Sequence, residues 1–290
     1  MTRHNLRPPE LGQAPFLGRE ALRRGLLTAG QLRGPTFRRL SQGIFVDADC
    51  PDSHRIRAEG VALILPEGAA ITGRSAACLD GLSLAEPNDP VHVLVQPGTR
   101  LRRRGCSVVS TEWLPAAHIR PGSPPVTIHT RTAWEVASEP DLIEAVAGLD
   151  ALFRAQHPRR EVMDAWVAKF PDSQAARAIA LSDVRAESPQ ESRVRVRLML
   201  AGFPAPEPQF RVWLSGRYPA RLDFAWPKKK VAVEYDGLWH GEAQQIEPDR
   251  ERLTALVDAG WRVYFLTNRQ LKDPARFEAF CAKLRRGLAA

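Results

Sequence analysis

One stretch of the chain, RLDFAWPKKKVAVEYDGLWH at residues 221–240, places three carboxylates on two short strand-like runs. Asp223 lies on the first run, and Glu234 and Asp236 lie on the second, after a Pro-Lys turn. Alternation with a period of two puts both acids of the second run on one face. If the runs pair as a hairpin, the acids converge, and they then resist burial unless a proton or a cation neutralises them.

The chemistry of this group favours a hard divalent cation. Carboxylate oxygens suit Mg²⁺, which is the usual ion beside phosphate substrates, so Asp223, Glu234 and Asp236 are predicted ligands of Mg²⁺ (or Mn²⁺). Each acid also has an ordinary explanation. Asp223 could pair with Arg221, and Glu234 could face solvent from an edge strand. Asp236 stands before a glycine, as is typical of turns.

The neighbouring segments predict a compact α/β domain with a mixed sheet. A helix opens at Ser188 and runs to about Ala201, where a glycine follows. A second helix covers residues 249–258 and ends before Gly260, and residues 261–266 alternate as a strand. The residues expected on the buried face of the second helix are Leu253, Leu256 and Val257.

The run LDFAWPKKKVAVEYDGLWH…DRERLTALVDAGWRVYFLT resembles the very-short-patch-repair-like branch of the PD-(D/E)xK nuclease superfamily, over about residues 186–285. The resemblance implies that Asp223 is the metal-binding aspartate and Glu234 the acid of the second strand. It implies further site residues: His240 near the scissile phosphate, Asp249 on the following helix and Glu191 on the first helix. Asp236 stands where the superfamily usually carries a lysine.

The missing lysine leaves open which group polarises the attacking water. His240 would act as a general base if its pKa lies near neutrality, or it is a structural imidazole beside Trp239. Arg252 is another candidate. The last candidates are Lys228, Lys229 and Lys230. These lysines could also hold a DNA phosphate. The alternative is that they form an ordinary solvated turn.

Glu191 carries a second explanation of its own. Ser188 and Glu191 have the S-x-x-E spacing of a capping box, and Pro189 occupies the first helical position. Capping alone accounts for this acid, so its role at a metal remains one of two alternatives.

Composition sets outer bounds on the partners. Lys and Arg number 41 against 33 Asp and Glu, which gives a net charge of +8. A basic surplus favours DNA as a partner, although an arginine-rich genome produces the same surplus. The four cysteines are scattered without a Cys/His cluster, so neither zinc nor a disulfide framework is expected. With no apolar signal core and no spanning run, we expect a cytoplasmic protein away from membranes.

The first 53 residues predict a winged-helix-like DNA-binding module. Residues 16–50 show small helices followed by a strand, with capping-box spacing at Thr28 and Gln31. Arg38 and Arg39 are expected on a short surface helix, where such modules meet DNA. Solvent exposure alone would also explain this arginine pair.

Residues 54–155 resemble the AbiEi-type antitoxin family through AAITGRSAACLDGL, VHVLVQP and RTAWEVAS…EAVAGLDALFR. The first motif predicts a strand and then a helix over 75–79, and Val91–Val95 predicts another strand. Helical spacing follows over 132–137 and 142–153, with core positions Val136, Leu142, Val146 and Leu149. The resemblance implies an α/β module that faces DNA or nucleotides, and an antitoxin role with a toxin partner.

The densest basic run, residues 100–104, falls between two predicted strands. Arg102, Arg103 and Arg104 are therefore predicted phosphate contacts on a loop. The alternative is a solvated hairpin tip. Residues 156–185 are polar and rich in arginine and alanine, and we interpret them as a helical linker.

These features predict an α/β protein, α+β overall, with a winged-helix and antitoxin-like region before a restriction-endonuclease-like mixed-sheet domain at 186–290. The expected activity is Mg²⁺-dependent hydrolysis of DNA phosphodiesters in repair or in defence against foreign DNA. The first alternative is an inactive nuclease fold that binds DNA as a regulator or antitoxin. The second is a structural partner in a toxin–antitoxin pair, and a homodimer is also compatible with the sequence.

Overall fold

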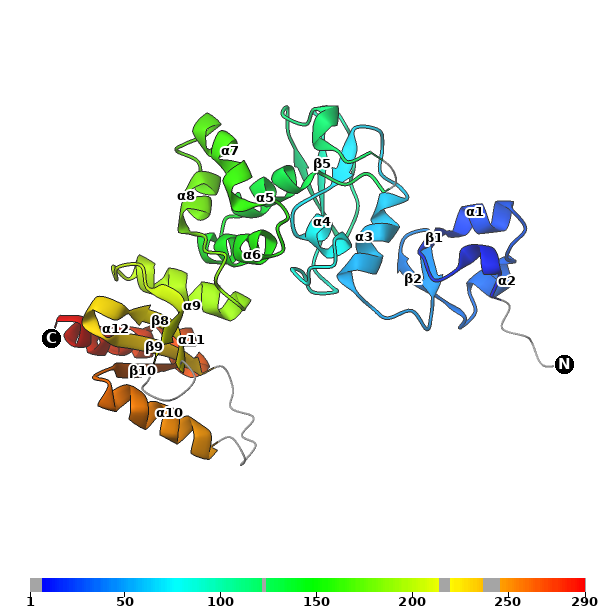
Figure 1. Ribbon diagram of the computed structural model, residues 1–290. Helices are drawn as coiled ribbons and strands as arrows, with labels where there is room; N and C mark the ends of the chain where they lie inside the picture. Colours follow the sequence, from blue (N-terminus) through cyan, green and yellow to red (C-terminus); the bar gives the residue numbers. More distant parts are fainter. Residues whose placement is uncertain (1–6, 122–123, 214–219, 237–245, 290) are drawn as a thin grey trace. The chain divides into compact units, whose positions relative to one another are not determined.

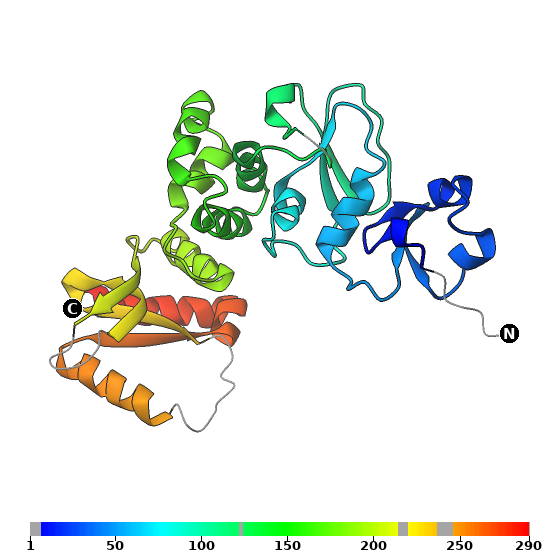
Figure 2. The same cartoon turned by 45° about the vertical axis from the view of Figure 1, so that its right-hand side comes forward.

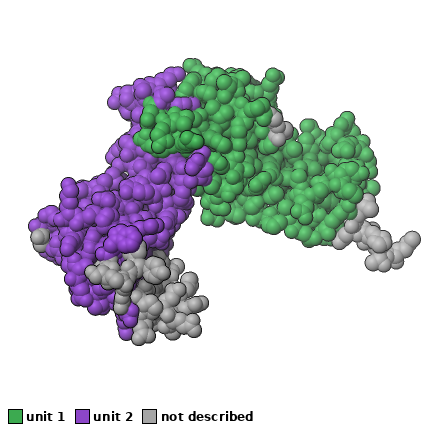
Figure 3. Space-filling view, in the orientation of Figure 1, with its two compact units in different colours: residues 1–138, 157–164 green, residues 139–156, 165–290 purple. Residues whose placement is uncertain are grey.

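A computed structural model describes residues 7–121, 124–213, 220–236 and 246–289, without the side chains of 246–249. The described residues fold as an α+β protein with three sheets (Figure 1). The chain forms two compact units, coloured separately in Figure 3. The first comprises Met1–Ser138 with His157–Asp164, and the second comprises Glu139–Gln156 with Ala165–Ala290.

The first unit begins with a three-stranded antiparallel sheet of order β1-β3-β2. Its elements are β1 (Phe16–Leu17), α1 (Gly18–Arg23), α2 (Ala29–Leu32), β2 (Phe37–Ser41) and β3 (Ile44–Asp47). Two short helices lie between the first strand and the β2–β3 hairpin, and the identity of this part as a winged-helix-like module stays a prediction. The predicted capping box of Thr28 and Gln31 is confirmed at the start of α2.

The placement of the arginine pair in this module was wrong. Arg38 and Arg39 lie on β2, not on a helix, because Phe37 packs edge-on against Phe16 at 5.3 Å and draws the segment into the sheet. Arg38 bonds Asp52 at 3.3 Å and the Cys50 carbonyl at 3.1 Å.

A second sheet of the first unit has the order β4-β5-β6. Its strands are β4 (Ala69–Ile71), β5 (Val91–Val95) and β6 (Cys106–Ser110), accompanied by α3 (His54–Ala62), α4 (Gly73–Leu79) and α5 (His129–Ala137). The predicted strands and the helix that ends before Gly81 are confirmed. Because β5 and β6 pair in parallel, the basic run between them is a crossover loop, and the hairpin-tip alternative is wrong.

The second unit starts with helices that precede the nuclease-like segment. They are α6 (Leu142–Arg154), α7 (Asp164–Lys169), α8 (Gln174–Leu181) and α9 (Pro189–Leu200). Val136 on α5 and Val146 and Leu149 on α6 are fully buried, whereas Leu142 is half-buried. Helix α6 packs on both α8 and α9, so the compact unit extends upstream of residue 186.

A mixed four-stranded sheet follows, with the order β10-β9-β8-β7. Its elements are β7 (Glu207–Val212), β8 (Ala220–Trp226), β9 (Val231–Asp236), α10 (Ile246–Asp258), β10 (Arg262–Thr267), α11 (Asn268–Lys272) and α12 (Pro274–Ala289). The predicted hairpin of β8 and β9 is confirmed as antiparallel, and β10 joins β9 in parallel. Strand β7 was not predicted. Short 3₁₀ turns occupy Pro9–Leu11, Ala116–His118, Arg160–Met163 and Pro227–Lys229.

Helices cover both faces of this sheet (Figures 1 and 2). Phe224 and Val233 pack with residues of α9 and α12, while Ala225 and Ala232 pack with Leu256 of α10. The prediction that Val257 is buried was wrong, because it is 63% exposed. The contact face of α10 centres on Leu256, and the next residue is turned about 100° away from it.

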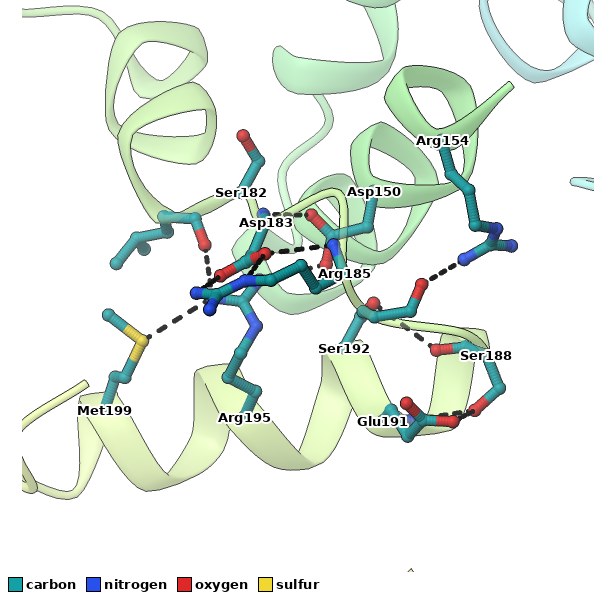
Figure 4. Close-up of polar contacts among 12 residues, drawn as sticks. Asp150, Arg154, Ser182, Asp183, Arg185, Ser188, Glu191, Ser192, Arg195 and Met199 are labelled. Carbon is teal, nitrogen blue, oxygen red and sulfur yellow. Dashed lines mark hydrogen bonds and ion pairs between the residues drawn. The ribbon is translucent and has the colours of Figure 1, made fainter. Parts of the chain in front are cut away.

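A buried ion pair fixes α9 against α6 (Figure 4). Arg195 Nη2 donates to Asp150 Oδ2 at 2.9 Å, and the two side chains are only 4% and 1% exposed. The other Asp150 oxygen accepts from the Asp183 amide at 2.7 Å, and Arg195 Nη1 donates to the Leu181 carbonyl at 2.6 Å. Helix α9 is therefore held to α6 and to the end of α8, and both Asp150 and Arg195 have further hydrogen-bond partners besides each other.

Replacing Arg195 with Ala is expected to destabilise the second unit by about 3–5 kcal/mol, because Asp150 is left as an uncompensated buried charge. The matched control is Arg193→Ala, which breaks the partly exposed α9–α6 pair with Glu144 and should cost about 0–1 kcal/mol. Urea unfolding followed by far-UV circular dichroism measures both. Equal losses in the two variants would contradict this assignment.

Candidate active site

Asp223 lies at an irregular point of the sheet. The β7–β8 ladder pairs Pro208 with Phe224 and Phe210 with Leu222, but it omits the pair between Gln209 and Asp223. Gln209 takes a φ of 53°, which bends its strand there. Asp223 Oδ2 accepts a hydrogen bond from the Tyr235 amide of β9 at 2.9 Å.

The hairpin register brings Asp223 beside Glu234. Phe224 pairs with Val233, so continuing the antiparallel ladder by one residue places the two acids opposite each other. Burial raises the pKa of Asp223, and the charges of Glu191 and Glu234 raise it further, against the Tyr235 amide and the Arg221 charge. Two predicted acids, Glu191 and Glu234, therefore disfavour the charge of a third, Asp223.

Glu191 fills the capping role considered for it, and its role at a metal stays a prediction. As the capping alternative requires, its amide bonds Ser188 Oγ at 3.2 Å, and its Oε1 accepts from that hydroxyl at 2.9 Å. Its Oε2 accepts from the Glu187 amide at 3.0 Å and from Gln209 Nε2 at 2.7 Å. Among the described residues, Gln209 Oε1 is buried without a hydrogen-bond partner. The cap thus also links α9 to the irregular point beside Asp223.

Glu234 is partnered by Arg252, which extends from α10. The guanidinium donates two bonds to the carboxylate, at 2.7 and 2.9 Å, and the side chains are 13% exposed for Glu234 and 29% for Arg252. Such a fork-to-fork pair fixes the carboxylate and balances its charge. The explanation of Glu234 as a solvent-facing acid on an edge strand is wrong, because β9 is a central strand.

The remaining acids are less closely gathered. Asp236 ends β9, where it pairs in register with Thr267 of β10. Across the described side chains, Asp223, Glu234 and Asp236 do not bring their ligand oxygens within 4.8 Å of one another. His240 and the side chain of Asp249 lie outside the described residues, so their roles stay predictions.

The cations near the acids also take definite places. Arg221 forms its ion pair with Glu187 at 2.9 Å, so the pairing with Asp223 considered above is not the contact formed. Lys228, Lys229 and Lys230 are exposed at the β8–β9 turn. Lys230 Nζ donates to the Ala259 carbonyl at 2.9 Å. The turn lysines lie at the hairpin end opposite Asp236.

The basic residues of the first unit do not form one equivalent group. Arg39 Nε donates to the Ser41 carbonyl at 3.1 Å, and Arg103 bonds Ser41 Oγ at 3.3 Å and the Gln42 carbonyl. Arg103 therefore joins the crossover loop to the β2–β3 turn. Arg102 and Arg104 are exposed on the same loop, where they remain candidates for phosphate contacts.

One cluster was missed by the sequence reasoning. Ligand atoms of Asp80, His129 and His157 lie within 4.8 Å of one another in the first unit. These residues are far apart in the sequence, and helix α6 separates the two histidines. No local spacing could have revealed them.

Comparison with known proteins yields similarity without a named activity. No family model matches the chain. It is 29% identical over 223 residues to an uncharacterized protein of Mycobacterium tuberculosis strain CDC 1551 / Oshkosh, covering 73% of this chain and 81% of the relative. An uncharacterized protein of strain ATCC 25618 / H37Rv matches with the same identity and coverage. Within the described residues, no helix has the length and apolar character needed to cross a membrane.

Replacing Asp223 with Asn is expected to raise the melting temperature of the metal-free protein at neutral pH. Asn keeps an acceptor for the Tyr235 amide and removes the repulsion from two neighbouring carboxylates. Because the folded-state pKa of Asp223 is raised, the stability cost of its charge is absent below the ordinary value of 3.8, grows between that value and the folded-state pKa, and is complete above it.

The gain should therefore vanish in acid, which thermal unfolding at a series of pH values measures. Asp150→Asn serves as the control, since it leaves Arg195 uncompensated and should lower the melting temperature. A loss of stability in Asp223→Asn comparable to that of the control would argue against the electrostatic interpretation.

Proposed function

We propose that the second unit is a divalent-cation-dependent DNA endonuclease that hydrolyses phosphodiester bonds. The observation that supports this most strongly is the state of Asp223. Its side chain is half-buried, and both Glu191 and Glu234 disfavour its charge. An acid kept in such a place at a cost to stability is typical of a functional site.

The donor set suits a hard cation. Asp223 offers carboxylate oxygens, of which Oδ2 accepts from a backbone amide, and Gln209 Oε1 lies buried nearby with no partner among the described residues. Glu234 retains further lone pairs, because each of its oxygens accepts one bond from Arg252. Asp223 and Glu234 would hold Mg²⁺ or Mn²⁺, with Asp236 as the proposed third ligand. When bound, the cation supplies an acidified water and charge stabilisation at phosphorus.

The other residues would orient these groups and the substrate. The Tyr235 amide fixes Asp223, while Ser188 and Gln209 fix Glu191. Arg252 supplies a cation beside the acids in place of the absent motif lysine, and it can bond a phosphate oxygen as well as Glu234. His240 is the proposed general base.

Exposed basic residues would bring DNA to this site. Arg102 and Arg104 on the crossover loop and the lysines of the β8–β9 turn are accessible to phosphates. Each phosphate neutralised adds to the salt dependence of binding. DNA repair and defence against foreign DNA are the proposed settings for such an activity.

The Glu234–Arg252 pair favours a second candidate function. An acid whose charge is already balanced by a bidentate arginine does not need a cation, so the fold could bind DNA as a regulator or antitoxin without cutting it. The two candidates differ in whether strand breaks depend on a divalent cation.

Purified protein incubated with supercoiled plasmid is expected to nick it with Mg²⁺ or Mn²⁺ and to leave it intact with EDTA. Asp223→Asn and Glu234→Gln should each reduce nicking by roughly 10²–10³-fold, the scale of losing one group that stabilises the transition state. Gel-shift affinity should change little. Agarose electrophoresis over time measures the rates.

Glu278→Gln is the matched control, because this acid forms an exposed pair with Arg285 on α12. It should nick DNA like the wild type. Cation-independent nicking, or equal nicking by all four proteins, would refute the assignment. DNA shifts without any cleavage by the wild type would establish the regulatory candidate instead.

A further inference from the structure

Three side chains from separate segments of the first unit meet at one place. Asp80 is the C-terminal cap of α4, His129 is the first residue of α5, and His157 begins the segment His157–Asp164. One ligand atom from each residue lies within 4.8 Å of the other two. Two imidazoles and a carboxylate are the donor types that bind zinc and related transition metals.

Two atoms of this cluster are buried without a hydrogen-bond partner among the described residues. They are Asp80 Oδ2 and His157 Nδ1, and the Asp80 side chain is only 13% exposed. Within the described part of the chain, Asp80 Oδ2 has only the 3.4 Å ion pair with His129, and a buried polar atom without a hydrogen bond lowers stability, so both atoms need an explanation. A shared cation would satisfy both atoms at once.

The distance between the carboxylate and one imidazole suits four-coordinate geometry. His129 Nε2 lies 3.4 Å from Asp80 Oδ2. With bonds of about 2.1 Å, neighbouring ligands of a tetrahedral zinc ion lie about 3.4 Å apart. The rings of His129 and His157 are stacked, with centroids 4.5 Å apart and planes at 16°. An imidazole nitrogen binds a metal in the plane of its own ring. Because the two stacked rings lie in different planes, one of them must tilt before both nitrogens point to the same ion.

Neighbouring groups support the same assignment. Arg120 Nη1 donates to Asp80 Oδ1 at 2.7 Å, which orients the carboxylate and leaves Oδ2 available. Asp80 and Arg120 also line a cavity of about 480 Å³.

We propose that Asp80, His129 and His157 bind one zinc-class ion, with a fourth position left for water. The ion would tie the segment His157–Asp164 to α4 and α5, although α6 separates that segment from them in the sequence. This site is independent of the acids on the second unit, because it has different donors and takes a softer metal.

The test uses full-length protein, freed of any affinity tag and stripped with a chelator. Calorimetry with Zn²⁺ should show one bound equivalent, and Co²⁺ should give the intense visible bands of a four-coordinate site. His129→Ala, His157→Ala and Asp80→Asn should each weaken Zn²⁺ binding by about 10- to 100-fold or more. His118→Gln, in the same unit but outside the group, should bind like the wild type.

Circular dichroism of the metal-free variants shows whether they fold, and the wild-type Co²⁺ spectrum tests the site without any substitution. Absence of a stoichiometric Zn²⁺ equivalent in the wild type overturns the proposal. So does a folded variant of any of the three residues that binds Zn²⁺ as tightly as His118→Gln. Asp223→Asn should keep the Zn²⁺ site, which separates this test from that of the nuclease.

Discussion

The buried pair of Asp150 and Arg195 is the contact on which the geometry of the second unit depends. Helix α9 carries Glu191 one turn before Arg195, so the contact that docks α9 also fixes the position of that acid. Desolvating two charges offsets much of their attraction, and apolar replacements are often as stable. We infer that the pair selects one packing of α6 and α9 rather than adding net stability. A purely apolar interface would allow the helices to slide, whereas the partners of both charges define one register.

Local signals in the sequence predicted most of the elements of this unit. The Ser188 cap, the glycines after two helices and the period-two runs act within a few residues, so their consequences can be read without a fold. Strand β7 was not predicted because Pro208, inside an otherwise alternating run, argues against a strand. Its pairing with β8 decides its conformation. The prediction that Val257 is buried failed for a related reason. Helical periodicity indicates that one face is buried, but tertiary packing determines which residues lie at its centre.

The contacts of the candidate site also divide into those that local sequence predicts and those that depend on tertiary packing. The approach of Asp223 to Glu234 follows from the hairpin itself, because the two acids are separated by one short turn. The Arg252 partner of Glu234 depends on how α10 docks, and the link from Glu191 to Gln209 depends on α9. The group of Asp80, His129 and His157 could not be predicted from the sequence, because its three residues come from distant segments that meet only in the folded protein.

Asp150, which is buried, and Asp223, which is half-buried, show two surroundings for a carboxylate in one unit. Burial raises the pKa of both, but Asp150 faces the guanidinium of Arg195 and donors to both of its oxygens. Asp223 instead faces Glu191 and Glu234, and its bonded partner is a neutral amide. A purely structural acid gains nothing from like-charged neighbours. The contrast therefore separates a carboxylate that serves packing from one that suits the proposed role of a cation ligand, and it does so without reference to any motif.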